Sequence, residues 1–180
     1  MDIYVSQQLA NFWNGFTKGG NMTVGLTIMR LQPLHKGHQK IIDIMLDENE
    51  KVILMIGSID VSDDKNPYSY EERLSMVQSV YGNEIKTKKL FIGGLKDIHN
   101  RPKWADYVTQ QLPFRADNYY CGQEQDGELF QEKGYIIKSF NRNILPISGT
   151  QIRQKIKNGD ISWQQDVSSK IHALIQRKEI

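Results

Sequence analysis

The feature that most limits the fold is a run of apolar residues at 51–56, which begins at Lys51 and ends before Gly57-Ser58. A strand with apolar side chains at nearly every position is typical of a parallel sheet covered on both faces. Four other segments have strand-like composition, at 24–29, 89–92, 118–122 and 135–140. Helical patterns alternate with these strands, at about 37–48, 69–80 and 103–111 and through Leu129 and Phe130.

This alternation predicts an α/β fold, with an open, mainly parallel sheet of five strands and helices on both faces. Ligands of such sheets bind beyond the carboxyl ends of the strands, at the point where the strand order reverses. Gly57-Ser58, Gly93-Gly94 and Gly122 all fall at the C-termini of predicted strands. We therefore expect a binding site at that edge.

Composition excludes several other classes of protein. The chain has 180 residues, which suit one domain, and its formal net charge of +2 gives no strong field for nucleic acid. The single cysteine, Cys121, fits a reducing compartment. No apolar run approaches the roughly 20 residues that span a bilayer, and the N-terminus lacks a signal-peptide pattern. We expect a cytoplasmic protein with no nucleic-acid or membrane partner.

Residues 1–22 look like an N-terminal extension to a domain at 23–180. Four large apolar residues of the extension have helical spacing, namely Leu9, Phe12, Trp13 and Phe16. They predict a short amphipathic helix. Its apolar face either packs on the same domain or contacts another subunit, so the chain could form a homo-oligomer.

The first predicted strand leads through a turn into the tetrad His35-Lys36-Gly37-His38. An amphipathic run follows at once, so both imidazoles lie at a helix start, where free N–H groups attract anions. Gly37 lets a phosphate approach the backbone, and both histidines can donate hydrogen bonds to it. A helix start with two solvated histidines is the alternative, and the position of the tetrad after a strand disfavours it.

A second anion-binding pattern, Ser148-Gly149-Thr150-x-x-Arg153, opens a later helix. Ser148 with Gln151 has the form of a capping box. The first-turn N–H groups, the two hydroxyls and the Arg153 guanidinium could together hold a polyphosphate. A simple cap with a surface arginine is the alternative interpretation.

These two motifs resemble those of the nucleotidyltransferase superfamily, and further matches resemble the archaeal-type nicotinamide mononucleotide (NMN) adenylyltransferases. The matching segments follow the expected order over about 23–175: Arg30-x-Gln32-Pro33-x-His35-x-Gly37-His38, Ile56-Gly57-Ser58, Asn66-Pro67-Tyr68, Glu72-Arg73, Asp97-Ile98-x-Asn100 with Trp104, Gly134-Tyr135 and Ser148-Gly149-Thr150-x-x-Arg153. The resemblance implies a Rossmann-like three-layer fold. It also implies that the protein joins NMN to ATP, giving NAD and pyrophosphate with Mg²⁺.

The chain departs from the family pattern at several positions. The family usually has glycine before the first arginine and an aromatic residue after it, where this chain has Met29 and Leu31. The usual Gly-Asn after the fourth strand is Gly122-Gln123, and the usual Gly-Glu-Arg is Glu71-Glu72-Arg73. The change at Gln123 concerns base or pyridine recognition rather than the class of reaction.

The resemblance implies in-line attack of the 5′-phosphate of the mononucleotide on the α-phosphorus of ATP. Such transfers depend mainly on positioning and charge neutralisation. His35 and His38 would hold the α- and β-phosphates, and Arg30 and Arg153 would clamp the triphosphate. The other residues implied for ATP are Gln32, Gly37, Lys65, Gly122, Ser148, Gly149 and Thr150.

The residues implied for NMN are Gly57, Ser58, Asp97, Asn100 and Trp104. Trp104 is the candidate stacking partner of the pyridine ring, with a place in the core as the alternative. Mg²⁺ would bridge ATP oxygens and water rather than occupy a carboxylate cage. No metal ligand is therefore expected from the protein, and Asp60, Asp63 and Asp64 are expected to be solvated loop residues.

Two other functions stay open. The acceptor could be a different phosphorylated compound, such as phosphopantetheine or a phospho-alcohol that receives CMP, although the match from Asp97 to Trp104 speaks against it. The domain could also be a non-catalytic nucleotide sensor, which the intact phosphate-binding residues of both motifs disfavour. Class I aminoacyl-tRNA synthetases carry a similar His-x-Gly-His element, but this chain is short for one and lacks their lysine-rich second signature.

Overall fold

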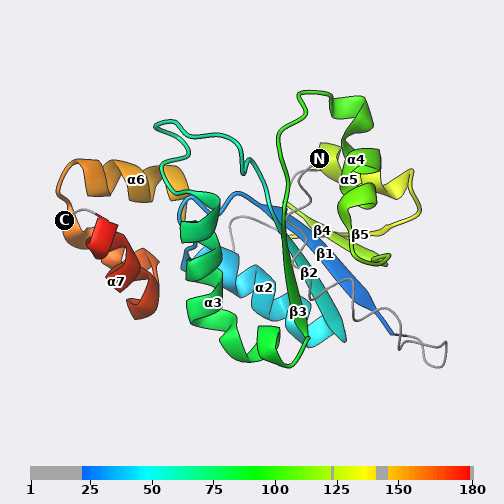
Figure 1. Ribbon diagram of the computed structural model, residues 1–180, viewed down its shortest axis with the longest axis horizontal. Helices are drawn as coiled ribbons and strands as arrows, with labels where there is room; N and C mark the ends of the chain where they lie inside the picture. The colour runs from blue at the N-terminus through cyan, green and yellow to red at the C-terminus, as the bar shows by residue number, and fades with distance from the viewer. Residues whose placement is uncertain (1–21, 123, 141–145, 179–180) are drawn as a thin grey trace.

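The computed structural model describes residues 22–122, 124–140 and 146–178 (Figure 1). The predicted N-terminal helix and Gln123 lie outside these residues. Five strands form one sheet: β1 (Val24–Met29), β2 (Lys51–Ile56), β3 (Leu90–Gly94), β4 (Asn118–Cys121) and β5 (Ile136–Ser139). Every pairing is parallel, and the strand order is β3-β2-β1-β4-β5. The predicted open parallel sheet of a Rossmann-like α/β fold is confirmed.

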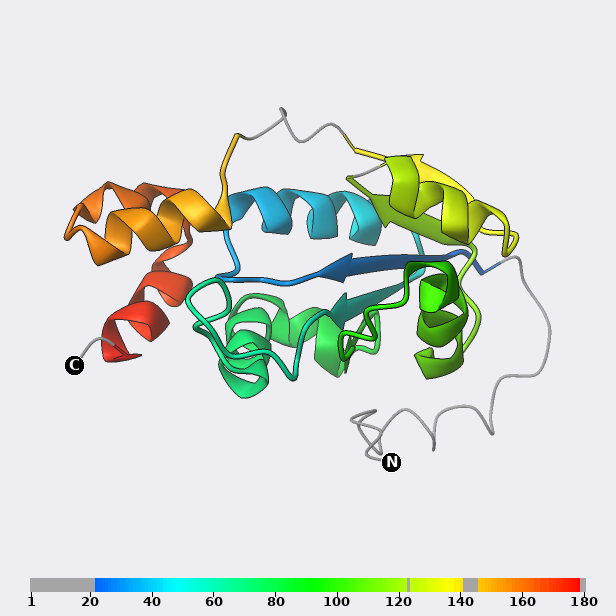
Figure 2. The same ribbon diagram turned by 90° about the horizontal axis from the view of Figure 1, so that it is seen from above.

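Helices cover both faces of this sheet (Figure 2). These helices are α2 (Lys36–Glu48), α3 (Tyr70–Lys86), α4 (Trp104–Gln111) and α5 (Glu124–Gln131). Helices α6 (Gly149–Lys157) and α7 (Ser169–Lys178) lie beyond the carboxyl ends of the strands. The 3₁₀ turns are η2 (Arg101–Lys103) and η4 (Ile161–Asp166). Within the described residues, no helix has the length and apolar character that a membrane crossing needs.

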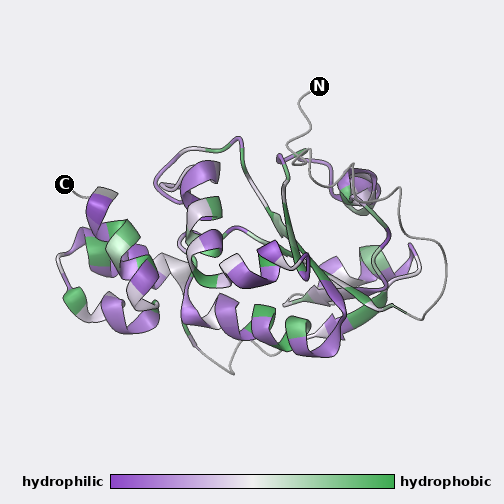
Figure 3. Ribbon diagram, turned by 60° about the horizontal axis from the view of Figure 1, so that its bottom comes forward, coloured by the Kyte–Doolittle hydropathy of each residue, from purple (hydrophilic) through white to green (hydrophobic). Residues whose placement is uncertain are grey.

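Strand β2 explains the three layers, because its side chains alternate between two hydrophobic clusters. Val52 and Leu54 belong to the cluster that also contains residues of α2, α3 and α7. Ile53 and Met55 belong to the cluster that contains residues of α4 and α5. The helices are correspondingly amphipathic, and Figure 3 shows hydrophilic and hydrophobic residues alternating along them. The apolar run that predicted a strand covered on both faces therefore has that structure.

Two helix starts that the sequence marks differ in detail. Ser69 caps α3 with a full capping box, in which Ser69 Oγ accepts from the Glu72 N–H and Glu72 Oε2 accepts from the Ser69 N–H. Ser148 also stands at the N-cap position of α6, but its side chain makes no capping hydrogen bond. The predicted capping box of Ser148 and Gln151 is therefore wrong. The first turn of α6 instead lines a cavity, as described below.

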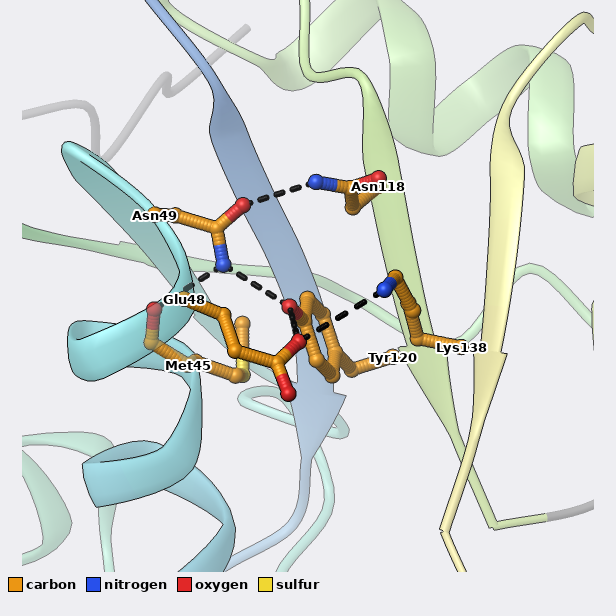
Figure 4. A network of polar contacts seen from close by, with 6 residues as sticks. All are labelled: Met45, Glu48, Asn49, Asn118, Tyr120 and Lys138. Carbon is orange, nitrogen blue, oxygen red and sulfur yellow. Dashed lines mark hydrogen bonds and ion pairs between the residues drawn. The ribbon is translucent and has the colours of Figure 1, made fainter.

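A buried polar network ties the end of α2 to the centre of the sheet (Figure 4). Asn49 Nδ2 donates to the Met45 carbonyl at 2.9 Å and to the Tyr120 hydroxyl at 2.8 Å. The Asn118 amide donates to Asn49 Oδ1 at 2.8 Å, and the Tyr120 hydroxyl donates to Glu48 at 2.6 Å. Burial raises the pKa of Tyr120 to about 12, helped by Glu48. This network fixes the C-terminal end of α2 on the sheet. The histidines lie at the other end of the same helix.

Candidate active site

A cavity of about 680 Å³ lies at the carboxyl ends of β1 and β4. The chain leaves β1 for β2 on one side, whereas β4 pairs with β1 on the other, so the strand order reverses at this point. Ligands of open parallel sheets bind at such points. The sequence-predicted residues that line the cavity are Arg30, Gln32, His35, Gly37, His38, Gly122, Ser148, Gly149, Thr150 and Arg153.

The two histidines stand at the start of α2 with stacked rings. Their ring centroids are 3.6 Å apart, with 22° between the ring planes. His35 is the N-cap, and its Nδ1 accepts the His38 backbone N–H at 3.3 Å. A Cβ at Gly37, between them, would lie 3.1 Å from the His35 ring, so a larger residue there would have to displace that ring slightly.

Burial lowers the pKa of His35 to about 4, although the negative charge of Asp166 opposes the change. His35 is therefore neutral near pH 7. Because its Nδ1 accepts a hydrogen bond, the proton of the neutral ring resides on Nε2. The ring can thus donate a hydrogen bond to an anion in the cavity without carrying a charge itself.

Helix α6 is pressed against the turn that follows β1. A Cβ at Gly149 would lie 2.7 Å from the Gln32 carbonyl oxygen, so only glycine permits this approach. Arg153 Nη1 donates to the same oxygen at 2.6 Å, and its Nη2 donates to Thr150 Oγ1 at 3.2 Å. Burial, and then the charge of Arg30, lower the pKa of Arg153. Arg30 and Arg153 both line the cavity, together with residues of the first turn of α6, a combination that favours phosphate.

The side-chain amide of Gln32 bonds the backbone of Tyr68. Its Nε2 donates to the Tyr68 carbonyl at 2.9 Å, and its Oε1 accepts the Tyr68 N–H at 3.0 Å. Both ends of the amide are thus bonded to the backbone, and the residue is buried. Gln32 holds the segment around Tyr68 against the turn after β1, and it also lines the cavity.

The residues predicted for NMN do not line this cavity; they follow the neighbouring strands β2 and β3. Ser58 Oγ donates to Asp97 Oδ1 at 3.0 Å, and the Asp97 N–H donates to Asp60 Oδ1 at 3.1 Å. Gly57, which precedes Ser58, is buried. A Cβ at Gly57 would meet only Ile28 and Arg30, at 3.7–3.8 Å.

Three further predicted residues, Asn100, Trp104 and Lys65, lie in segments that follow β3 or β2. Asn100 caps the η2 turn by accepting the Lys103 N–H at 3.3 Å. Trp104 is half-buried and tilted against Tyr107, with ring centroids 5.8 Å apart. Lys65 is exposed on the loop between β2 and α3, where its N–H donates to Asp63 Oδ1. Asp63 and Asp64 are exposed too, as expected for loop residues.

Some residues that line the cavity lie outside the motifs recognised in the sequence. They are Tyr119, Tyr120, Cys121, Asp126 and Phe140 among others. The predicted strand at 118–122, which contains Tyr119, Tyr120 and Cys121, gave the signal for these three. Asp126 is the single carboxylate among the described lining residues, and it pairs with Arg101 at 3.5 Å. Nowhere in the described part of the chain do three His, Cys, Asp or Glu side chains gather to hold a metal ion.

Comparison with known proteins identifies the family of this chain. Residues 30–155 match the family model described as cytidylyltransferase-like. A nicotinamide-nucleotide adenylyltransferase of Thermococcus kodakarensis is 32% identical over 157 residues, which cover 84% of this chain and 81% of that protein. Proteins of the same name from Thermococcus sibiricus and Pyrococcus furiosus are 34% and 31% identical, over 82% and 86% of this chain and 80% and 84% of theirs. The chain belongs to the nicotinamide-nucleotide adenylyltransferase family.

Solved structures extend the match to the fold of this family. A bifunctional NMN adenylyltransferase/ADP ribose pyrophosphatase from Francisella tularensis has a TM-score of 0.69 and 28% identity. The same Francisella protein complexed with AMP and a manganese ion has a TM-score of 0.72 and 27% identity. The match covers 88% of this chain, which spans about half, 50%, of the bifunctional protein.

Proposed function

We propose that this protein transfers the adenylyl group of ATP to nicotinamide mononucleotide, forming NAD and pyrophosphate. The observation that carries the proposal is that two helix starts line one cavity, with His35 and His38 at the start of α2 and Gly149 and Arg153 from α6. Relatives of similar length that bear the name of this activity support it.

The reaction exchanges one bond at the α-phosphorus. An oxygen of the NMN 5′-phosphate attacks it in line, and the bond to the bridging oxygen breaks, so that pyrophosphate leaves with the electron pair. Negative charge grows on the departing oxygens, where fixed hydrogen-bond donors have the largest effect on rate. We assign this stabilisation to the Nε2–H of neutral His35 and to His38, with Arg30 and Arg153 neutralising the phosphates.

We propose Mg²⁺–ATP as the nucleotide substrate. The cavity lining provides imidazole, hydroxyl and guanidinium groups and the single carboxylate of Asp126, which suit phosphate oxygens rather than a protein-held hard cation. Mg²⁺ supplies charge neutralisation when it arrives on the phosphates. The chain itself contributes the donors around them: Ser148, Gly149 and Thr150 from α6, Gly37 from α2, and Gly122 after β4, with Lys65 on the neighbouring loop.

For the acceptor we propose the edge formed by β2 and β3. Ser58 and Asp97, with Gly57 beside them, have polar groups suited to the ribose hydroxyls, and Asn100 orders the segment that leads to Trp104. The Trp104 indole would then stack on the pyridine ring. We assign catalysis to residues 23–180, with residues 1–22 as an extension that contacts either this domain or a second copy. The cytoplasmic location stays a prediction.

The decisive experiment is product analysis of the purified protein with ATP, Mg²⁺ and either nicotinamide or nicotinic acid mononucleotide. We expect the dinucleotide and pyrophosphate in equal amounts, and no product without the divalent cation. Parallel reactions replace ATP by CTP and the mononucleotide by phosphopantetheine. Product only in one of these reactions would move the protein to another transferase class, and ATP binding without any turnover would indicate a nucleotide sensor.

A further inference from the structure

The α3 residue Arg73 is a fully buried cation, with 0% of its surface exposed. Its Nη1 donates to the carbonyls of Arg30 at 2.8 Å and Gly57 at 2.7 Å. Its Nη2 donates to the Ser58 carbonyl at 3.2 Å, and its Nε donates to the Ser69 carbonyl at 3.1 Å. Four hydrogen bonds thus leave one planar group toward three separate segments of the backbone.

Burying a cation in this way is costly, and the acceptors are neutral carbonyls. Burial lowers the pKa of Arg73, and the charges of Glu71 and Glu72 only partly oppose this. For joining helix to sheet alone, an apolar side chain of similar volume often serves as well as a buried ionic one. Stability alone therefore does not explain why position 73 has a buried arginine. The three segments that Arg73 contacts suggest another role.

Each segment that Arg73 contacts carries residues of the proposed site. The Arg30 carbonyl belongs to the turn after β1, which leads to Gln32 and the histidines. The Ser58 carbonyl belongs to the turn after β2, and the Ser58 side chain donates a hydrogen bond to Asp97. The Ser69 carbonyl ends the loop that carries Lys65. Both Leu31 and Ser58 have φ of 53°, an uncommon conformation for residues with side chains, so these turns need outside support.

We propose that Arg73 is a positioning residue, which sets the distance and angle between the ATP side and the acceptor side of the active site. This inference rests on the proposed function. ATP is held mainly by α2 and α6, and NMN by the Ser58–Asp97 edge. The guanidinium group joins the turn after β1 to the turn after β2 through their backbone carbonyls, without touching either substrate.

In-line transfer is sensitive to such alignment, because the attacking oxygen must lie behind the bond that breaks. A misplacement of about 1 Å far from the chemistry can lower the rate about 100-fold. Loss of the guanidinium group should therefore lower kcat while each substrate still binds to its own segment. A purely structural role would instead lower thermal stability and leave turnover by the folded protein unchanged.

The test compares Arg73→Lys with Tyr81→Phe in the full chain. Lysine keeps the charge but lacks the planar guanidinium group. Tyr81→Phe removes a buried hydroxyl of the same helix, which donates to the Gln39 carbonyl at 3.1 Å and to Asp43 at 2.9 Å. For Arg73→Lys we expect kcat to fall about 10- to 100-fold, with the Kd of each substrate, titrated singly, changing less than about threefold. Tyr81→Phe should lower Tm and keep kcat.

Arg73→Gln, which keeps donors without the charge, is measured alongside as the second variant. A folded Arg73→Lys or Arg73→Gln protein with wild-type kcat would overturn the inference. So would failure of both variants to fold, because Arg73 would then be a stability residue, and so would an equal loss of kcat in Tyr81→Phe. The wild-type reaction is run first. An inactive wild type rejects the proposed function itself, and the inference with it, whereas an active wild type leaves the variants to decide on Arg73 alone.

Discussion

The two halves of the carboxyl edge of the sheet use their polar side chains differently. Between β1 and β4, His35, His38 and Arg153 line a cavity, and backbone groups of His38 and Gln32 bond the side chains of His35 and Arg153. Along β2 and β3, Ser58 bonds Asp97, and Trp104 leans on Tyr107. In the first half, these hydrogen-bond donors line a cavity. In the second half the polar groups satisfy one another.

This difference has a physical origin in the ligands that we propose. A triphosphate needs many donors fixed in advance, because charged groups that must reorganise lose much of their effect on the rate. A sugar and an aromatic ring need few polar contacts. The protein side chains that would contact them can therefore bond one another until the ligand arrives. We therefore expect substitutions in the first half to act on turnover and those in the second half on acceptor affinity.

The strongest test of the first half is His38→Ala. We expect kcat to fall at least about 100-fold, because one fixed donor to developing charge contributes about 3–4 kcal/mol to lowering the barrier. The variant should remain folded, since His38 is only partly buried. Steady-state kinetics with both substrates, together with a circular-dichroism melt, checks both statements. Near-normal turnover would remove His38 from the mechanism.

Gly149→Ala tests whether the cavity depends on the close approach of α6. The new Cβ would lie 2.7 Å from the Gln32 carbonyl oxygen, so the helix start must move away from the turn. We expect a cost of about 1–3 kcal/mol, shared between stability and ATP affinity. Gly82→Ala on α3 is the matched control, because its Cβ meets nothing within 4 Å. Equal Tm and ATP Kd values for the two variants would contradict this interpretation of α6.

Sequence reasoning was most successful where chemistry and pattern coincide. The apolar run of β2 predicted its own burial, and the His-x-Gly-His and Ser-Gly-Thr-x-x-Arg motifs predicted the residues that share the cavity. It was weaker where partners are distant in the chain. Nothing local shows that the Gln32 amide serves Tyr68, 36 residues away, or that Arg73 reaches Arg30, 43 residues away. The capping box failed at Ser148 for a related reason, because its helix start is positioned by Gln32 rather than by its own sequence.

The acidity of His35 gives a stability test of the first half. Its pKa is near 4 in the folded protein and 6.5 as the ordinary value, so below pH 6.5 the unfolded chain binds a proton that the fold excludes. The free energy of unfolding should fall as pH decreases from 6.5 toward 4, by about 2 kcal/mol at pH 5. His35→Asn keeps an N-cap acceptor and removes the titration. Urea unfolding at pH 5 and 7.5 should show this extra loss in the wild type alone; equal losses in both proteins would contradict it.

The smallest expected effect concerns Trp104 in the second half. The positively charged pyridine ring of NMN over an indole gains stacking and cation–π attraction of roughly 1–2 kcal/mol when desolvated. Trp104→Ala should therefore weaken NMN binding about 5- to 30-fold, Trp104→Phe should weaken it less, and ATP affinity should stay constant. Calorimetric titration of each substrate separates these outcomes.

Trp104 is partly buried beside Tyr107, so the alternative to stacking on NMN is a packing role in the core. If the indole only covers the α4 side of the core, Trp104→Ala should lower Tm, and any loss of affinity should extend to ATP as the fold weakens. Tyr107→Leu then serves as the matched control, because it removes the neighbouring ring and its hydroxyl, which accepts the Lys96 N–H at 3.2 Å, from the same helix. Weaker NMN binding in Trp104→Ala with unchanged binding in Tyr107→Leu would assign the indole to the acceptor. Equal effects in the two variants would make the α4 side plain packing and move the pyridine pocket toward the cavity between β1 and β4.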